Sequence, residues 1–194
     1  MIKNKKADKR EFILSEAAKL FKQKGYGASS MRDLAEQVGL DAASMYHYIS
    51  SKDEILKTIC FKIAHHYLSH LSEMEHQNIS YTQKLKALVR LHIQVMVSNA
   101  AEVSVANNDW KYLSAQALNE FKELRRTYER RLEALIEDGV KAGELEPVHT
   151  PVALFTLLSA VRWVELWWRP NRGISTDELE NSIITILFNG LERK

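Results

Sequence analysis

The sequence has 194 residues, of which 45% are hydrophobic, so it can form a core and does not have the composition of a disordered chain. Seven glycines and three prolines are too few for the many turns of an all-β fold. The single cysteine, Cys60, excludes an intrachain disulfide, no window is apolar enough to span a membrane, and the basic N-terminus lacks the apolar stretch of a secretory signal, so we expect a cytoplasmic protein.

Three helices are predicted near the N-terminus. Apolar periodicity, with glycines as stops, places them over residues 8–25, 31–38 and 42–48. Ser30 with Asp33 three residues later is typical of a capping box, and Asp41 can cap the third helix.

A longer helical region makes up the rest of the chain. Apolar residues at every fourth position predict a long helix from Lys52 to Glu75. Further helices are expected over residues 82–99, 102–108, 114–142, 151–168 and 175–191. We therefore predict an all-α fold of about nine helices, with a first domain over residues 1–52 and a second over residues 53–194.

The charge is distributed unevenly between these two parts. Residues 1–52 carry ten basic and six acidic side chains, a net charge of +4, whereas the whole chain has +2, which leaves −2 for residues 53–194. A basic end suits a polyanionic partner, although a basic arm can equally be a solvated tail.

The segment from residue 29 to residue 52 has the spacing of a helix-turn-helix. Two short helices meet through Gly39, and the small side chain of Ala35 lets them cross closely. The second helix would present its outer face to the major groove of DNA. Its hydroxyls can donate to phosphates, its alanines can touch thymine methyl groups, and Arg32 can reach a guanine edge or a phosphate. Lys52, with the free amides at the start of the next helix, can hold a further phosphate. The candidate DNA contacts are Arg32, Ala42, Ala43, Ser44, Tyr46, His47, Tyr48 and Lys52. For Tyr46, partial packing in the core is an equal alternative.

The run SMRDLAEQVGL–DAASMYHYISSKDEIL resembles the N-terminal domain of the TetR family of transcriptional regulators. The resemblance covers about the first third of the chain and has no gap. It implies that residues 31–38 form the supporting helix, that residues 42–48 form the recognition helix, and that the helix from Lys52 links the head to a ligand-binding domain. It also implies an all-helical homodimer that binds operator DNA and senses a small molecule.

The second part of the chain has no enzyme motif, so we expect no catalytic activity and no cofactor. Its aromatic and polar residues suggest an apolar pocket with a few polar anchors, although ordinary core packing explains most of them equally well. The segments NNDWKYL and RWVELWWRPNRGIS resemble TetR-type repressors that respond to acyl-CoA thioesters. The candidate ligand contacts are His92, Met96, Trp110, Phe121, Arg125, Tyr128, Trp163 and Trp167.

The last two helices are expected to form the dimer. One apolar stripe lies on each, and two helices from each subunit can form a four-helix bundle. The candidate interface residues are Leu154, Leu157, Leu158, Val161, Ile183, Ile186 and Leu187. A symmetric dimer predicts a palindromic operator, with recognition helices about 34 Å apart.

Two alternative functions remain open on the sequence. A sensor of cationic or aromatic drugs would need an acidic group in the pocket, for which Glu165 is the nearest candidate. A small-molecule-binding module or enzyme without a DNA partner would leave the helix-turn-helix spacing unexplained. His66 and His70 have the spacing of two metal ligands, but with no clear third ligand beside them or His65 we expect no metal.

Overall fold

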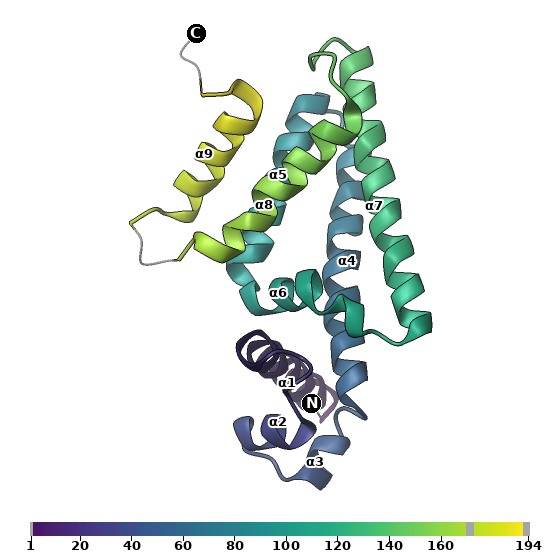
Figure 1. Cartoon of the computed structure of the whole chain (residues 1–194), viewed down its shortest axis with the longest axis vertical. Helices are drawn as coiled ribbons and strands as arrows, with labels where there is room; N and C mark the ends of the chain where they lie inside the picture. The colour runs from purple at the N-terminus through teal and green to yellow at the C-terminus, as the bar shows by residue number, and fades with distance from the viewer. Residues whose placement is uncertain (1, 170–172, 192–194) are drawn as a thin grey trace. The chain divides into compact units, whose positions relative to one another are not determined.

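The computed structural model describes residues 2–169 and 173–191. Within these residues every element of regular secondary structure is a helix (Figure 1). The predicted all-α class is therefore confirmed. The helices are α1 (Ile2–Lys24), α2 (Met31–Gln37), α3 (Ala42–Tyr46), α4 (Lys52–His76), α5 (Tyr81–Ser98), α6 (Ala100–Asn108), the short 3₁₀-helix η1 (Trp110–Tyr112), α7 (Ala115–Lys141), α8 (Thr150–Trp167) and α9 (Thr176–Asn189).

The expected helices agree with the observed bounds to within two residues at each end, except at the start of α1. Helix α1 begins at Ile2 instead of residue 8, because the lysine-rich N-terminal segment contains no glycine or proline that would stop a helix. Helix α3 ends at Tyr46, two residues before the expected end, and residues 47 and 48 continue as a turn. Boundaries of this kind are the least certain part of a prediction from periodicity.

The chain forms two compact units that interleave along the sequence. The first contains residues 1–65 and 101–123, and the second contains residues 66–100 and 124–194. Helices α4 and α7 each contribute residues to both units. The predicted domain boundary between residues 52 and 53 does not coincide with a boundary of these units, and it stays a prediction from the sequence.

In the first unit, α1 packs against α2 and α2 packs against α3. Side chains from these helices, from the turn after α3 and from the start of α4 are almost completely shielded from solvent, namely Ile13, Phe21, Leu34, Met45, Ile49, Ile55 and Leu56. Ala35, the small residue expected at the crossing of the two short helices, is also buried.

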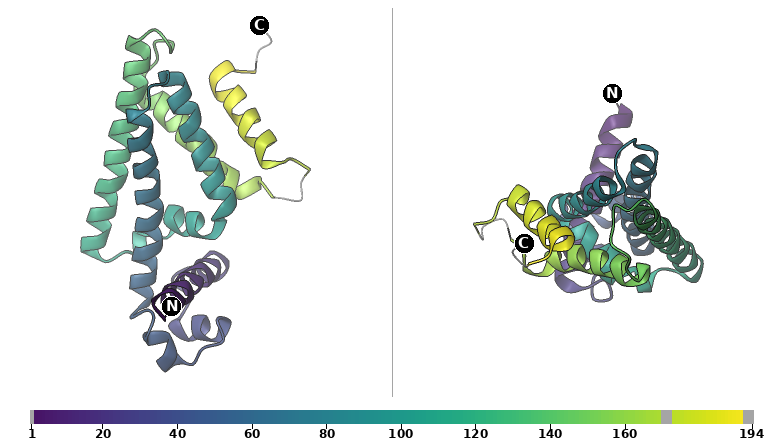
Figure 2. Two further views of the ribbon diagram at one scale, coloured as in Figure 1. Left: turned by 180° about the vertical axis from the view of Figure 1, so that it is seen from behind. Right: turned by 90° about the horizontal axis from the view of Figure 1, so that it is seen from above.

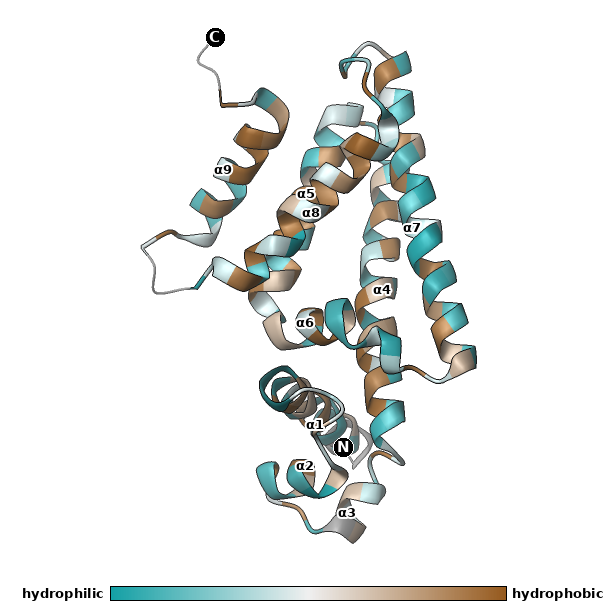
Figure 3. Ribbon diagram, in the orientation of Figure 1, coloured by the Kyte–Doolittle hydropathy of each residue, from teal (hydrophilic) through white to brown (hydrophobic). Residues whose placement is uncertain are grey.

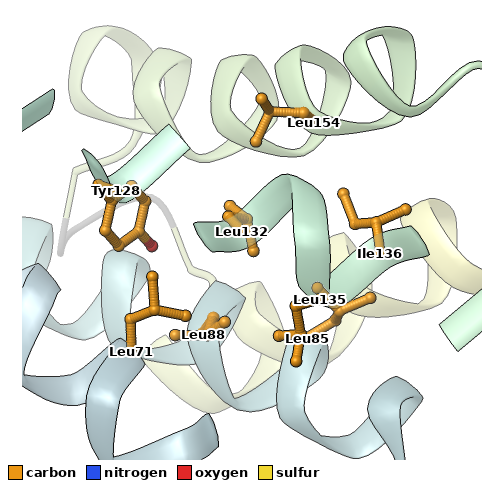
Figure 4. Close-up of a cluster of buried hydrophobic side chains, with 8 residues drawn as sticks. All are labelled: Leu71, Leu85, Leu88, Tyr128, Leu132, Leu135, Ile136 and Leu154. Carbon is orange, nitrogen blue, oxygen red and sulfur yellow. The ribbon is translucent and has the colours of Figure 1, made fainter. Parts of the chain in front are cut away.

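In the second unit, α5 lies beside both α8 and α9 (Figure 2). The core is formed by leucines from α4, α5, α7 and α8 together with one tyrosine and one isoleucine of α7 (Figure 4). Its members are Leu71, Leu85, Leu88, Tyr128, Leu132, Leu135, Ile136 and Leu154. None of the helices in the described residues has the length and apolar character needed to cross a bilayer.

Candidate nucleic-acid interface and ligand pocket

Helix α2 begins with the predicted capping box. The amide of Ser30 donates to the Asp33 carboxylate at 2.8 Å, and the amide of Asp33 donates to the Ser30 hydroxyl at 3.1 Å. The Ser30 hydroxyl and the Lys24 ammonium, 2.9 Å from Oδ1, hold the pKa of Asp33 down at about 2. The start of the supporting helix is therefore fixed by contacts that are encoded within a few residues.

Asp41 caps α3 in the same manner. Its carboxylate accepts the Ser44 amide at 2.8 Å and the Ser44 hydroxyl at 2.7 Å, and these bonds lower the pKa of Asp41. A helix of five residues has few internal hydrogen bonds, so this cap accounts for much of its local stability. Because the Ser44 hydroxyl already donates to Asp41, it would have to rotate before it could donate to a phosphate.

The two faces of α3 differ sharply in exposure. Met45 is 1% exposed and packs in the core of the first unit, whereas its neighbour Tyr46 is 55% exposed. Ala43 and His47 are also exposed, and Tyr48 is half-buried. The side chain of Ala42, another predicted DNA contact, lies outside the described residues. Core packing, the alternative considered for Tyr46, does not agree with its exposure.

Arg32 and Lys52 have different environments. Arg32 is exposed at the first turn of α2. The Lys52 ammonium donates to the carbonyl oxygens of Tyr26 and Ser29 at 2.9 and 2.8 Å, and it lies 4.3 Å from the centre of the Tyr26 ring. Lys52 therefore fastens the start of α4 to the turn between α1 and α2, and only the third of its N–H donors is left for a phosphate.

Tyr26 is the centre of a cluster that sequence reasoning missed. Its hydroxyl donates to the Asp53 carboxylate, and its ring stacks on Tyr112 of η1. Burial, with Asp53 close by, raises the pKa of the Tyr26 hydroxyl. Asp53 lies 27 positions after Tyr26 and Tyr112 lies still farther along the chain, so no local pattern could have indicated these two contacts.

The second unit contains a pocket with about 250 Å³ of atom-free space, including its open mouth. Helices α5, α7 and α8 supply its walls, which are apolar except for two side chains. The lining residues are Leu85, Leu88, Val89, His92, Tyr128, Leu132, Leu157, Leu158 and Val161. Two of the predicted ligand contacts, His92 and Tyr128, are the two polar residues of this lining.

These two polar side chains are hydrogen-bonded to each other. His92 Nε2 lies 2.7 Å from the Tyr128 hydroxyl, and the His92 ring stacks on Tyr67 with ring centroids 4.0 Å apart. Burial, with a smaller contribution from His70, lowers the pKa of His92 to about 4, and burial raises the pKa of Tyr128. Both groups are thus neutral near pH 7. Tyr67 was absent from the predicted contacts because nothing in its own helix distinguishes it from a core residue.

The other predicted ligand contacts do not line this pocket. Met96 is buried on α5. Trp110 and Phe121 belong to the first unit, where their ring centroids lie 6.2 Å apart.

The last three predicted ligand contacts lie on α7 and α8 but also outside the lining. Arg125 forms an ion pair with Glu129 of the same helix, and Trp163 and Trp167 are exposed on α8. Six of the eight predicted ligand contacts therefore lie outside the lining of this pocket, and two of these six belong to the first unit.

The apolar stripe predicted as an interface on α8 faces the inside of the subunit. Leu154 belongs to the core, and Leu157, Leu158 and Val161 line the pocket. On α9, Ile186 is 49% exposed, whereas Ile183 and Leu187 are half-buried.

No group of three or more potential metal ligands is present in the described part of the chain. His65 and His66 are exposed, and His70 lies 3.6 Å from the carboxylate of Glu73.

Comparison with known proteins assigns both parts of the chain. Residues 13–59 match the domain described as bacterial regulatory proteins of the tetR family, and residues 78–191 match the tetracyclin repressor-like C-terminal domain. The chain belongs to the TetR family. It is therefore a DNA-binding transcriptional regulator of the repressor type and not an enzyme.

Individual TetR-family proteins are similar over nearly their whole length. The repressor KstR2 of Rhodococcus jostii (strain RHA1) is 24% identical over 188 residues, which cover 96% of this chain and 92% of that protein. The crystal structure of PfmR from Thermus thermophilus has 30% identity and a TM-score of 0.83, covering 93% of this chain and 99% of that one. AibR, solved in complex with isovaleryl coenzyme A and operator DNA, has 23% identity and a TM-score of 0.81, covering 92% and 97%.

Regulators of the TetR family bind operator DNA and form dimers. In this chain, the family domain over residues 13–59 includes the whole of α2 and α3 and the start of α4. The predicted helix-turn-helix and the family resemblance are therefore confirmed.

Proposed function

We propose that this TetR-family regulator is a repressor that leaves a palindromic operator when an acyl-CoA thioester binds in the pocket of the second unit. The observation that carries the effector class is the pocket lining, which is apolar except for the neutral pair His92 and Tyr128. AibR, whose fold is similar, is complexed with isovaleryl coenzyme A, which agrees with this class. The protein would act where the bacterial chromosome lies, in the cytoplasm.

The DNA-contacting surface is proposed to be the exposed side of α3 with the first turn of α2. Tyr46, His47 and Ala43 are exposed there, and Arg32 is exposed on α2. Hydroxyl and imidazole groups can donate to phosphates, and the guanidinium can bind a guanine edge or a phosphate. Ala42, Ser44 and Tyr48 remain proposed contacts, and Lys52 supplies positive charge while it holds the head together.

The apolar lining supports a thioester over a cationic drug. A cation inside an apolar pocket needs a carboxylate to replace its hydration, and none of the described lining residues is acidic. Glu165 is buried on α8 but is not part of the lining.

The dimer interface is proposed on the other side of α8 from the predicted stripe. Val152, Phe155, Trp163 and Leu166 recur at helical spacing, and each is more than half exposed. Figure 3 shows the brown, apolar colour along both α8 and α9. Exposed apolar residues grouped on one side of a helix mark an interaction surface. Ile186, with its neighbours Ile183 and Leu187, would extend this surface onto α9.

Fluorescence anisotropy with the DNA upstream of the protein's own coding sequence tests this function. We expect specific binding whose affinity falls steeply as the salt concentration rises. Straight-chain acyl-CoAs of two to ten carbons should release the protein from this DNA, whereas cationic dyes should not. Operator binding that no thioester reverses, together with release by a cationic dye, would instead support the drug-sensor alternative. Absence of specific binding to that DNA would count against the proposed operator.

A further inference from the structure

The positive charge of residues 1–52 is confined to one short stretch. Residues 1–10 contain four lysines, one arginine and one aspartate, a net charge of +4. Residues 11–52 contain five basic and five acidic residues and are neutral in total. The whole excess therefore lies at the start of α1, which begins at Ile2.

The helix-turn-helix itself lacks the charge that DNA binding requires. Residues 33–51, which include α3, contain three acidic residues and no lysine or arginine. Lys52 uses two of its N–H donors on carbonyl oxygens, and Arg32 is the only other lysine or arginine among the proposed contacts. Neutralisation of phosphates by such cations supplies most of the sequence-independent affinity of proteins for duplex DNA. Further cations are therefore needed from outside this segment.

The start of α1 is held beside the turn that follows α3. Arg10 Nη2 lies 2.9 Å from Glu54 Oε1, and the other oxygen of this carboxylate accepts the Ser50 amide at 2.8 Å and the Ser50 hydroxyl at 2.7 Å. Helical spacing places Lys6 and Lys3 on the side of α1 that carries Arg10, because they precede it by four and seven residues. At a rise of about 1.5 Å per residue, they lie about 6 and 11 Å from Arg10 along the helix axis.

The charge at this end of α1 is not balanced locally. The first turn of α1 contains no acidic residue. Lys6 is exposed, whereas Lys19, Lys24 and Lys62 of the same unit each form an ion pair with a carboxylate. In the view from above, the purple start of α1 projects beyond the other helices of the first unit (Figure 2). The stretch thus presents positive charge next to the end of the recognition helix.

We infer that the lysine-rich start of α1 is a second DNA-contacting element, which binds the phosphate backbone bordering the major groove that α3 enters. The inference rests on the proposed DNA-contacting surface and adds to it contacts that read no bases. Phosphate is the partner that fits, because a lysine ammonium on its flexible stem binds phosphate as a point charge and needs no fixed geometry.

The salt dependence of DNA binding measures these contacts. The double variant Lys3→Gln/Lys6→Gln removes two ammonium groups from each subunit, and glutamine has nearly the helix propensity of lysine. Each phosphate contact contributes about 0.9 to the slope of log affinity against log salt concentration, so the loss of four in the dimer should reduce the slope by about 3–4. At about 0.1 M salt we expect the affinity to fall about tenfold or more.

Arg130→Gln/Lys141→Gln is the matched control. It removes the same charge from two exposed positions of α7 in the second unit and should leave the slope and the affinity near the wild-type values. All proteins are used without an N-terminal tag, and the midpoint of urea denaturation checks that each is folded. Anisotropy is measured on the DNA upstream of the coding sequence and on a duplex of unrelated sequence. The variant should lose the same factor on both, because phosphate contacts carry no sequence information.

Each outcome bears on the inference. An unchanged slope for Lys3→Gln/Lys6→Gln would show that the start of α1 is a solvated tail and would overturn the inference. An equal loss in the control variant would assign the effect to net charge, and a loss on the upstream DNA alone would indicate base contacts, so either result would also contradict it. If the wild-type protein bound both duplexes equally, the proposed operator would fail, while the slopes on the unrelated duplex would still decide the role of α1.

Discussion

Tyr26 and Tyr112 lie face to face, with ring centroids 5.4 Å apart and planes inclined by 26°. Tyr26 follows α1, and Tyr112 is the last residue of η1, so the stack joins the DNA-binding head to the segment that precedes α7 within the first unit. Lys52 and Asp53, at the start of α4, contact the same Tyr26. A displacement of η1 would thus reach the start of α4 through one aromatic ring.

We expect Tyr112→Ala to lower the free energy of unfolding by about 1 kcal/mol, because stacked aromatic pairs contribute about 0.5–1.5 kcal/mol beyond the area they bury. Urea denaturation measures this loss. Tyr112→Phe keeps the ring and should behave like the wild-type protein. If the alanine and phenylalanine variants had the same stability, the stack would contribute nothing.

Met45 and Tyr46 are neighbours on α3 with opposite exposure, which gives a matched pair of substitutions. Met45→Ala should lower the free energy of unfolding by about 2–5 kcal/mol, because it leaves a cavity in the core. Tyr46→Ala should change stability by less than about 0.5 kcal/mol but weaken operator binding. Anisotropy and denaturation on both variants check this, and normal operator affinity for Tyr46→Ala would remove Tyr46 from the proposed interface.

The cap of α3 links local stability to DNA binding. Asp41→Ala removes the acceptor of the Ser44 amide and should cost about 1 kcal/mol of stability. Operator affinity should fall as well, because the recognition helix is short and frays without its cap. Asp41→Asn keeps an acceptor and is expected to retain most of both properties. An alanine variant as stable as the asparagine variant would contradict the role of the cap.

His92 should make stability depend on pH. Its folded pKa, about 4, lies below the ordinary value of about 6.5, so the unfolded chain binds more protons between these values. The contribution of His92 is complete above about pH 6.5 and is lost as the pH falls toward 4, with a slope of at most about 1.4 kcal/mol per pH unit. Urea denaturation of the wild-type protein and of His92→Leu between pH 4 and 7.5 measures the contribution of His92. All other titrating groups are present in both proteins, so the difference between the two stability curves belongs to His92. Parallel stability curves would show that His92 titrates normally.

The proposed dimer surface predicts a change of assembly. Phe155 is 52% exposed on α8, and Phe155→Glu would place a charge in a desolvated interface, so we expect the dimer to dissociate. Ala134→Glu adds the same charge at an exposed position of α7 and should leave the dimer intact. Sedimentation equilibrium distinguishes the two states, and a dimeric Phe155→Glu variant would place the interface elsewhere.

Much of the fold followed from the sequence by itself, because helix starts and stops are encoded within a few residues. The Ser30–Asp33 capping box, the Asp41 cap and the glycine-bounded helices were predicted from such local signals and are present. The helix-turn-helix was recognisable for the same reason. Its determinants all lie within residues 29–52 and do not depend on distant parts of the chain.

Only the tertiary structure decided which side of α8 faces inward. Leu154 is 3% exposed and Phe155 is 52% exposed, yet both belong to apolar stripes with helical spacing. Periodicity cannot choose between two apolar faces, because the choice depends on which helix packs against each. The same holds for Lys52, whose ammonium meets carbonyl oxygens from 23 and 26 positions earlier, and for Tyr67, whose role is defined by a ring on another helix.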